Sequence, residues 1–164
     1  MHGLLNLSHL LGVLLAVAGT WSIRFELRRK SVPVWRLFLP AAAVLLCSLA
    51  LLGGLSTRGR GIWLVALVVG LPAGAVRGLW LRMRTDYAAR LVRLSPVRDG
   101  LWTTVLAALL AATDVFVTLR SEEDAPVSPL FAAGAALCAG YLGGRALVTR
   151  ALGLGHASGS ALKA

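Results

Sequence analysis

Five apolar stretches dominate the chain, and each is about as long as a lipid bilayer requires of a spanning helix. Such a helix needs about 20 mainly apolar residues. The stretches run approximately over residues 3–21, 34–54, 61–81, 100–119 and 128–147. We therefore expect an all-α fold, a polytopic integral membrane bundle of five transmembrane helices.

Little of the chain remains outside these stretches. Five spans of about 20 residues account for roughly 100 positions, and only short loops and a tail are left. We predict a single transmembrane domain over residues 1–152 and a flexible cytoplasmic tail over 153–164, where Gly, Ser and Ala predominate. The composition, 57% hydrophobic and 15% charged, argues against a soluble globular domain and against intrinsic disorder.

The positive charge of the chain gives its orientation. Seventeen Lys and Arg stand against seven Asp and Glu, a formal net charge of +10. In a soluble protein such a balance suggests a nucleic-acid partner, but here fourteen of the seventeen basic residues fall on one side of the predicted spans. Basic loops stay cytoplasmic. We expect the N-terminus outside, the C-terminus in the cytoplasm, a bacterial-type plasma (inner) membrane, and no nucleic-acid partner.

A cleaved signal peptide is the alternative for the first stretch, because small residues follow its apolar run at Ala16, Ala18 and Gly19. It is disfavoured, since only His2 precedes the apolar run where a signal peptide carries positive charge. The positions of the tryptophans also support five spans, because all of them fall near the ends of predicted spans, as interfacial tryptophans do. These are Trp21, Trp35, Trp63, Trp80 and Trp102.

Small residues four apart predict close helix packing in the third and fifth spans. They are Gly70, Gly74 and Gly78 in the third span, and Ala132, Ala136, Gly140 and Gly144 in the fifth. The two helices in such a contact can belong to one chain or to two copies, or these small residues can simply reflect an Ala- and Gly-rich composition. Pro72 beside the glycines suggests a bend or a broken helix.

Asp114 is the clearest candidate for an intramembrane functional group, because charges at membrane depth are costly. It lies about six residues, roughly 9 Å, from the outer end of the fourth span. His9 lies at a similar depth in the first span. The two can form a structural polar contact, a proton-accepting pair, or no contact at all.

Arginines near the cytoplasmic span ends are candidate contacts for anions or lipid head groups. They are Arg77, Arg82, Arg84 and Arg145. The simpler interpretation for Arg77 and Arg145 is that their side chains snorkel to the head groups. The basic loops as a whole predict attraction to anionic lipids.

Catalytic motifs are absent from the sequence. It holds no phosphate loop, HExxH, GxSxG or CxxC. Cys47 and Cys138 stand alone on different spans and are interpreted as packing residues. We expect no cofactor and no metal site, and whether the chain is an enzyme stays uncertain, with the balance against it.

A family resemblance covers most of the chain. The opening from Val13 through the basic run 28–30 to Pro33, then Leu39 and Pro40, is similar to that of the CcdC-like bacterial membrane proteins, named from a cytochrome c maturation locus. The glycine-rich third span and the Gly144-Arg145 pair also resemble theirs. The resemblance implies a small polytopic inner-membrane protein, although the sequence has no haem-attachment CxxCH to support a maturation role.

Two functional hypotheses follow. The first is a structural or accessory membrane component that packs with itself or with a membrane-protein partner. The alternative is a small transporter or channel subunit with a polar site near Asp114 and His9. An intramembrane enzyme ranks below both.

Overall fold

The computed structural model describes residues 13–15, 17–23, 32–52, 56–80, 83–86, 91–94, 98–120 and 129–161. Residues 13–15 and 17–23 are helical. The elements that follow are β1 (Val32–Pro33), the 3-10 helix η1 (Val34–Phe38), α2 (Leu39–Leu52), α3 (Thr57–Leu79), β2 (Met83–Asp86), β3 (Leu91–Leu94), α4 (Asp99–Arg120) and α5 (Pro129–Ala161). The expected helical fold is thus confirmed, with one addition, a small sheet.

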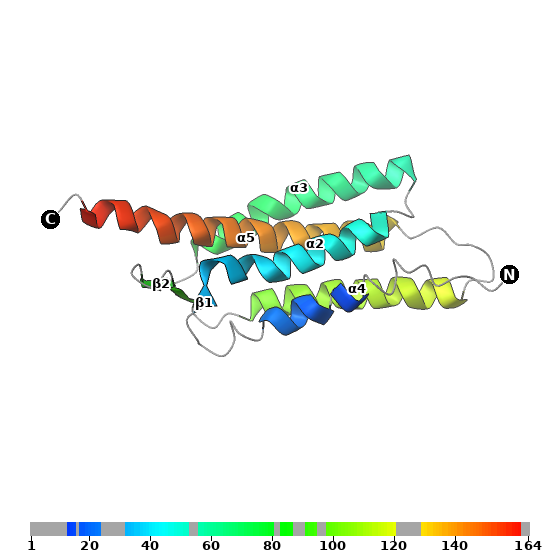
Figure 1. Cartoon of the computed structure of the whole chain (residues 1–164). Coiled ribbons are helices and arrows are strands. Elements are labelled where there is room, and N and C mark those ends of the chain that lie inside the picture. Colours follow the sequence, from blue (N-terminus) through cyan, green and yellow to red (C-terminus); the bar gives the residue numbers. More distant parts are fainter. Residues whose placement is uncertain are drawn as a thin grey trace.

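The helices form an elongated bundle in which successive helices run in opposite directions (Figure 1). Helix α5 is central, because α2, α3 and α4 all pack against it, and its contact with α3 is the most extensive in the molecule. Strands β1 and β2 lie at the same end of the bundle, where the later part of α5 also lies (Figure 1).

The helix boundaries follow from local sequence chemistry. Ser56 caps α3, because its side-chain oxygen accepts a hydrogen bond from the backbone N–H of Gly59 at 3.3 Å. Pro40 and Pro129 lie in the first turns of α2 and α5, where a missing N–H costs nothing. Pro72 lies inside α3, which continues past it to Leu79. The expectation of a broken helix is therefore wrong.

A three-stranded antiparallel sheet joins two connections that the sequence predicts to be loops. Its strand order is β1-β3-β2. Val32 pairs with Val92, and β2 pairs with β3 in the register Met83 with Leu94 to Asp86 with Leu91. The sheet lies where α3 ends and α4 begins, and we call this the sheet end of the bundle.

Three helices are long and apolar enough to cross a membrane, judged by length and composition: Thr57–Leu79, Asp99–Val117 and Pro129–Leu152. Two shorter apolar helices cover Val13–Ile23 and Trp35–Leu51. The chain is therefore a membrane protein. The segment from residue 153, expected to be a flexible tail, is helical as far as Ala161 because α5 continues through it.

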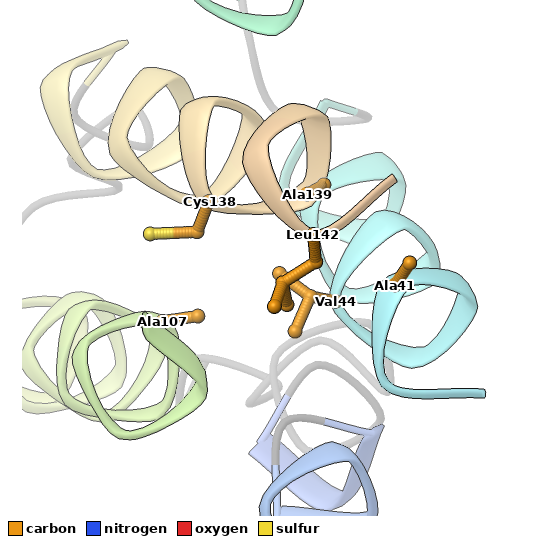
Figure 2. Packing of buried hydrophobic residues seen from close by; sticks show 6 residues of the cluster. All are labelled: Ala41, Val44, Ala107, Cys138, Ala139 and Leu142. Atoms are coloured by element: carbon orange, nitrogen blue, oxygen red, sulfur yellow. The ribbon is translucent and has the colours of Figure 1, made fainter. Parts of the chain in front are cut away.

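Small side chains fill the interior. One cluster joins α2, α4 and α5 through Ala41, Val44, Ala107, Cys138, Ala139 and Leu142 (Figure 2). A second surrounds Trp63 near the start of α3, with Leu51, Ala132, Ala135 and Ala136. Large apolar side chains such as Leu64, Val68 and Leu109 are exposed on the outer faces of the helices, as lipid contact requires.

Candidate functional site: a polar cluster at the sheet end

The two glycine stripes face each other across the α3–α5 contact. A methyl group built on Gly74 would overlap the backbone carbonyl of Tyr141, and one on Gly144 would overlap the carbonyl of Leu71. A Cβ on Gly70 would lie 3.2 Å from Cα of Gly140. Because no side chain separates them, the two backbones approach directly, which maximises dispersion contact where lipid offers no hydrophobic drive.

Gly78 continues this contact toward the sheet end, since its Cβ would lie 3.1 Å from the carbonyl oxygen of Arg145. On α5, Ala132 and Ala136 are fully buried beside Trp63. Both stripes are thus occupied within one chain, and they are not available to pair with a second copy.

An ion pair forms where the α3–α5 contact reaches the sheet end. Nε of Arg77, near the end of α3, donates a hydrogen bond to Oδ2 of Asp99 at 3.0 Å. Asp99 is the first residue of α4, where the positive end of the helix dipole also stabilises a carboxylate. Its other oxygen, Oδ1, accepts a hydrogen bond from the backbone N–H of Gly100 at 2.8 Å.

Helix α5 supplies two further partners of the same carboxylate. The Tyr141 hydroxyl donates to Oδ2 of Asp99 at 3.0 Å, and Nη1 of Arg145 lies 4.0 Å from Oδ1. One carboxylate therefore joins α3, α4 and α5. We call Arg77, Asp99, Tyr141 and Arg145 the Asp99 cluster.

The cluster changes the interpretation of the two arginines. The side chain of Arg145 is 6% exposed, so the expectation that it snorkels to the head groups is wrong. Arg77 keeps 38% of its side chain exposed. The anion that both arginines approach is the chain's own Asp99. Of the other predicted basic contacts, Arg84 lies in β2 and Arg82 falls outside the described residues.

Sequence reasoning missed Asp99 because it searched for charges at mid-membrane depth, whereas Asp99 lies at a span end. Tyr141 was missed because an aromatic residue in an apolar span is normally interpreted as packing. Their spacing of 42 positions along the chain gives no local pattern. The available signal was chemical, namely an acidic residue at the start of a predicted span in a region otherwise rich in arginine.

Asp114 is buried in the bundle, with a relative exposure of 2%. One turn before it on α4, Ala111 packs with Cys47 of α2 and is flanked by Val13 and Leu15. The expected partner His9 lies outside the described residues, so the proposed pair stays a prediction. Asp114 does not belong to the Asp99 cluster, which lies at the other end of α4.

The buried hydroxyls bond within their own helices. Ser48 donates to the carbonyl of Leu45 at 2.8 Å, Thr104 to that of Leu101 at 2.9 Å, and Thr149 to that of Arg145 at 2.7 Å. Thr113, on the exposed side of α4, does the same with Leu109 at 2.8 Å. Such bonds satisfy the hydroxyl without a cross-helix partner.

Trp35, Trp80 and Trp102 are exposed at the sheet end, in η1, directly after α3 and in the first turn of α4, and Trp21 is exposed near the end of the helix over 17–23. This is the position of an interfacial aromatic belt. Trp63 differs, because it is buried against α5 and its indole Nε1 has no hydrogen-bond partner among the described residues. The interfacial interpretation is therefore wrong for Trp63, and it stays a prediction for the exposed tryptophans.

No group of three or more His, Cys, Asp or Glu within the described residues could hold a metal ion. Comparison of the chain with protein-family models, with curated proteins and with solved structures gives no match.

Proposed function

We propose that the chain is a five-span plasma-membrane protein with its N-terminus outside and its sheet end in the cytoplasm. The alternation of helix directions supports this arrangement (Figure 1). So does the charge, because the sheet end receives Arg36, Arg77, Arg84, Arg93, Arg98, Arg145 and Arg150, whereas the other end receives Arg58, Arg60 and Arg120. The positive-inside rule assigns the richer end to the cytoplasm.

Within that membrane, its role is structural or accessory and not enzymatic. The observation that carries this proposal is that helix–helix contacts fill the interior of the bundle and its described hydroxyls bond within their own helices. Helix α5 is held to α3 by direct backbone contact, and the described buried hydroxyls of Ser48, Thr104 and Thr149 turn back onto their own helices. Such an interior is built for packing, because these described hydroxyls are satisfied within their own helices and form no row of donors or acceptors for a passing solute.

The alternative, a small transporter or channel subunit, is favoured by one observation, the burial of the Asp114 carboxylate at membrane depth. Intramembrane carboxylates recur in proton and ion pathways. The resemblance to the CcdC-like family fits either role, and it stays a prediction.

Reconstitution into liposomes separates the two roles. We expect the purified chain to leave a proton or cation gradient as stable as protein-free liposomes do, with the Asp114→Asn variant indistinguishable from wild type. Circular dichroism of both proteins would establish that each is folded. A flux that wild type supports and Asp114→Asn abolishes would overturn the accessory role in favour of transport.

A further inference from the structure

Two arginines from different helices converge on Asp99 at the sheet end. Nε of Arg77, in the last turn of α3, donates to Oδ2 of Asp99 at 3.0 Å. Arg98 directly precedes Asp99 in the chain, and consecutive Cα atoms lie about 3.8 Å apart. The fold therefore brings an arginine of α3 and an arginine at the start of α4 to one carboxylate.

Arg77 is oriented by Asp99 and keeps donors for another acceptor. A guanidinium has five N–H donors, and the hydrogen bond to Asp99 uses the one at Nε. The carboxylate is itself fixed by the Tyr141 hydroxyl and by the Gly100 N–H. Because 38% of the Arg77 side chain stays exposed, its terminal nitrogens, Nη1 and Nη2, are available to an anion at the surface of the bundle.

Arg98 adds a second, exposed guanidinium. Its carbonyl accepts a hydrogen bond from the backbone N–H of Trp102 at 3.0 Å, so Arg98 opens the first turn of α4. Together with Arg145, which lies 4.0 Å from Oδ1 of Asp99, three arginines lie around this carboxylate. Positive charge therefore exceeds negative charge within the group, which favours an anionic ligand.

A tryptophan accompanies each of the two exposed arginines. Trp80, which caps α3 in a helical conformation, is three positions after Arg77. Trp102 is four positions after Arg98. Residues three or four apart are neighbours on a helix surface, and both indoles are exposed. Because tryptophans at span ends lie at the head-group level, the proposed arrangement in the membrane puts both arginines at the depth of the lipid phosphates.

We propose that Arg77 and Arg98 together bind the phosphate of an anionic phospholipid in the cytoplasmic leaflet. Guanidinium groups hold phosphate oxygens through parallel pairs of N–H donors, and the excess of positive charge selects a lipid with a net negative charge. The depth given by Trp80 and Trp102 selects a lipid over a soluble anion. This inference rests on the proposed function, because it takes the sheet end to be cytoplasmic.

The test uses single variants of the full chain purified in detergent. Arg98→Gln removes one ligand of the phosphate and leaves the bonds of the Asp99 cluster in place. Arg77→Lys keeps the charge but loses the planar fork, because an ammonium is a point charge on one nitrogen. Arg150→Gln is the matched control, since it removes an exposed arginine of α5 that lies over the Phe38 ring, outside the proposed site.

Phosphatidylglycerol, phosphatidylcholine and inorganic phosphate are titrated separately. Binding is followed by native mass spectrometry and by the rise in unfolding temperature. We expect phosphatidylglycerol to bind wild type and Arg150→Gln equally, and to bind Arg98→Gln and Arg77→Lys each about 10-fold more weakly. Without lipid, Arg98→Gln should unfold at the wild-type temperature, so its loss of binding reports on the site and not on folding.

Four results would overturn the proposal. Wild-type binding by Arg98→Gln would remove Arg98 from the site, and an equal loss in Arg150→Gln would show attraction to the charge of this end in general. Phosphatidylcholine binding as tight as that of phosphatidylglycerol would show that lipid charge is not selected. Inorganic phosphate binding of the same strength would identify a soluble anion as the ligand.

Carbonate extraction of membranes from cells that express the chain separates this inference from the proposed function. If the wild-type chain is released by carbonate, the five-span proposal fails, whatever the lipid titration gives. If the chain stays embedded and Arg98→Gln binds like wild type, only the lipid site fails.

Discussion

The Arg77–Asp99 ion pair, 3.0 Å from Nε to Oδ2, joins the end of one membrane-spanning helix to the start of the next. The connection between them contains β2 and β3, so the pair closes the base of the helix–sheet–helix unit. Tyr141 binds the same carboxylate oxygen from α5. The carboxylate therefore holds the end of α3 and the start of α4, between which β2 and β3 lie, to α5.

Loss of this pair should weaken the bundle measurably. We expect Asp99→Asn to lower the free energy of unfolding in detergent by about 1–3 kcal/mol, because Arg145 then lies buried beside a neutral amide. Arg77→Gln should cost less, since Arg77 is partly exposed. Thermal unfolding of the two single variants and the double variant gives the coupling energy. Strictly additive losses would show that the two side chains do not interact.

Gly74 tests the α3–α5 contact. Gly74→Ala should destabilise the bundle by about 1–3 kcal/mol, because the added methyl group overlaps the Tyr141 carbonyl and must push the helices apart. Gly61→Ala on the same helix is the matched control, since a Cβ there meets nothing within 4 Å, and it should be neutral or stabilise α3 slightly. Equal losses from both substitutions would contradict the close contact.

The positions of the two small-residue stripes, on α3 and α5, could be predicted from the sequence, because a repeat of small residues four apart can be recognised within one helix. That they face each other within one chain was not, since a stripe does not identify its partner. The sheet was missed for a different reason. Its strands have two to four residues each, too few for a period of two to stand out among charged loop residues.

The Asp99 cluster depends on contacts 22 to 46 positions apart, such as those of Asp99 with Arg77 and Arg145. The distribution of basic residues predicted that these arginines lie at the same end of the spans. It did not predict that one carboxylate contacts both of them. Burial of Trp63 was also inaccessible, because its position near a span end is the same as that of the exposed tryptophans. Its packing against Leu51 of α2 and against Ala132 and Ala136 of α5 distinguishes it.

Tryptophan depth can be measured in lipid. In variants that retain a single tryptophan, Trp102 should be quenched strongly by a spin label at the head-group level and weakly by one at the end of the acyl chain. Trp63 should be quenched weakly by both, because α5 and α2 cover its ring. Fluorescence in vesicles that contain each labelled lipid checks this. Stronger head-group quenching of Trp63 than of Trp102 would contradict the burial that separates them.

The central claim, five spans with the sheet end in the cytoplasm, is tested most directly by cysteine accessibility in intact cells. Single cysteines are placed at Ser56, Ser95, Ser121 and Ser160 in a chain whose Cys47 and Cys138 are replaced by Ala, and a membrane-impermeant maleimide is applied. We predict labelling at Ser56 and Ser121 in intact cells, and labelling at Ser95 and Ser160 only after permeabilisation. Labelling at Ser95 or Ser160 in intact cells would contradict the arrangement and would remove the cytoplasmic leaflet as the location of the sheet.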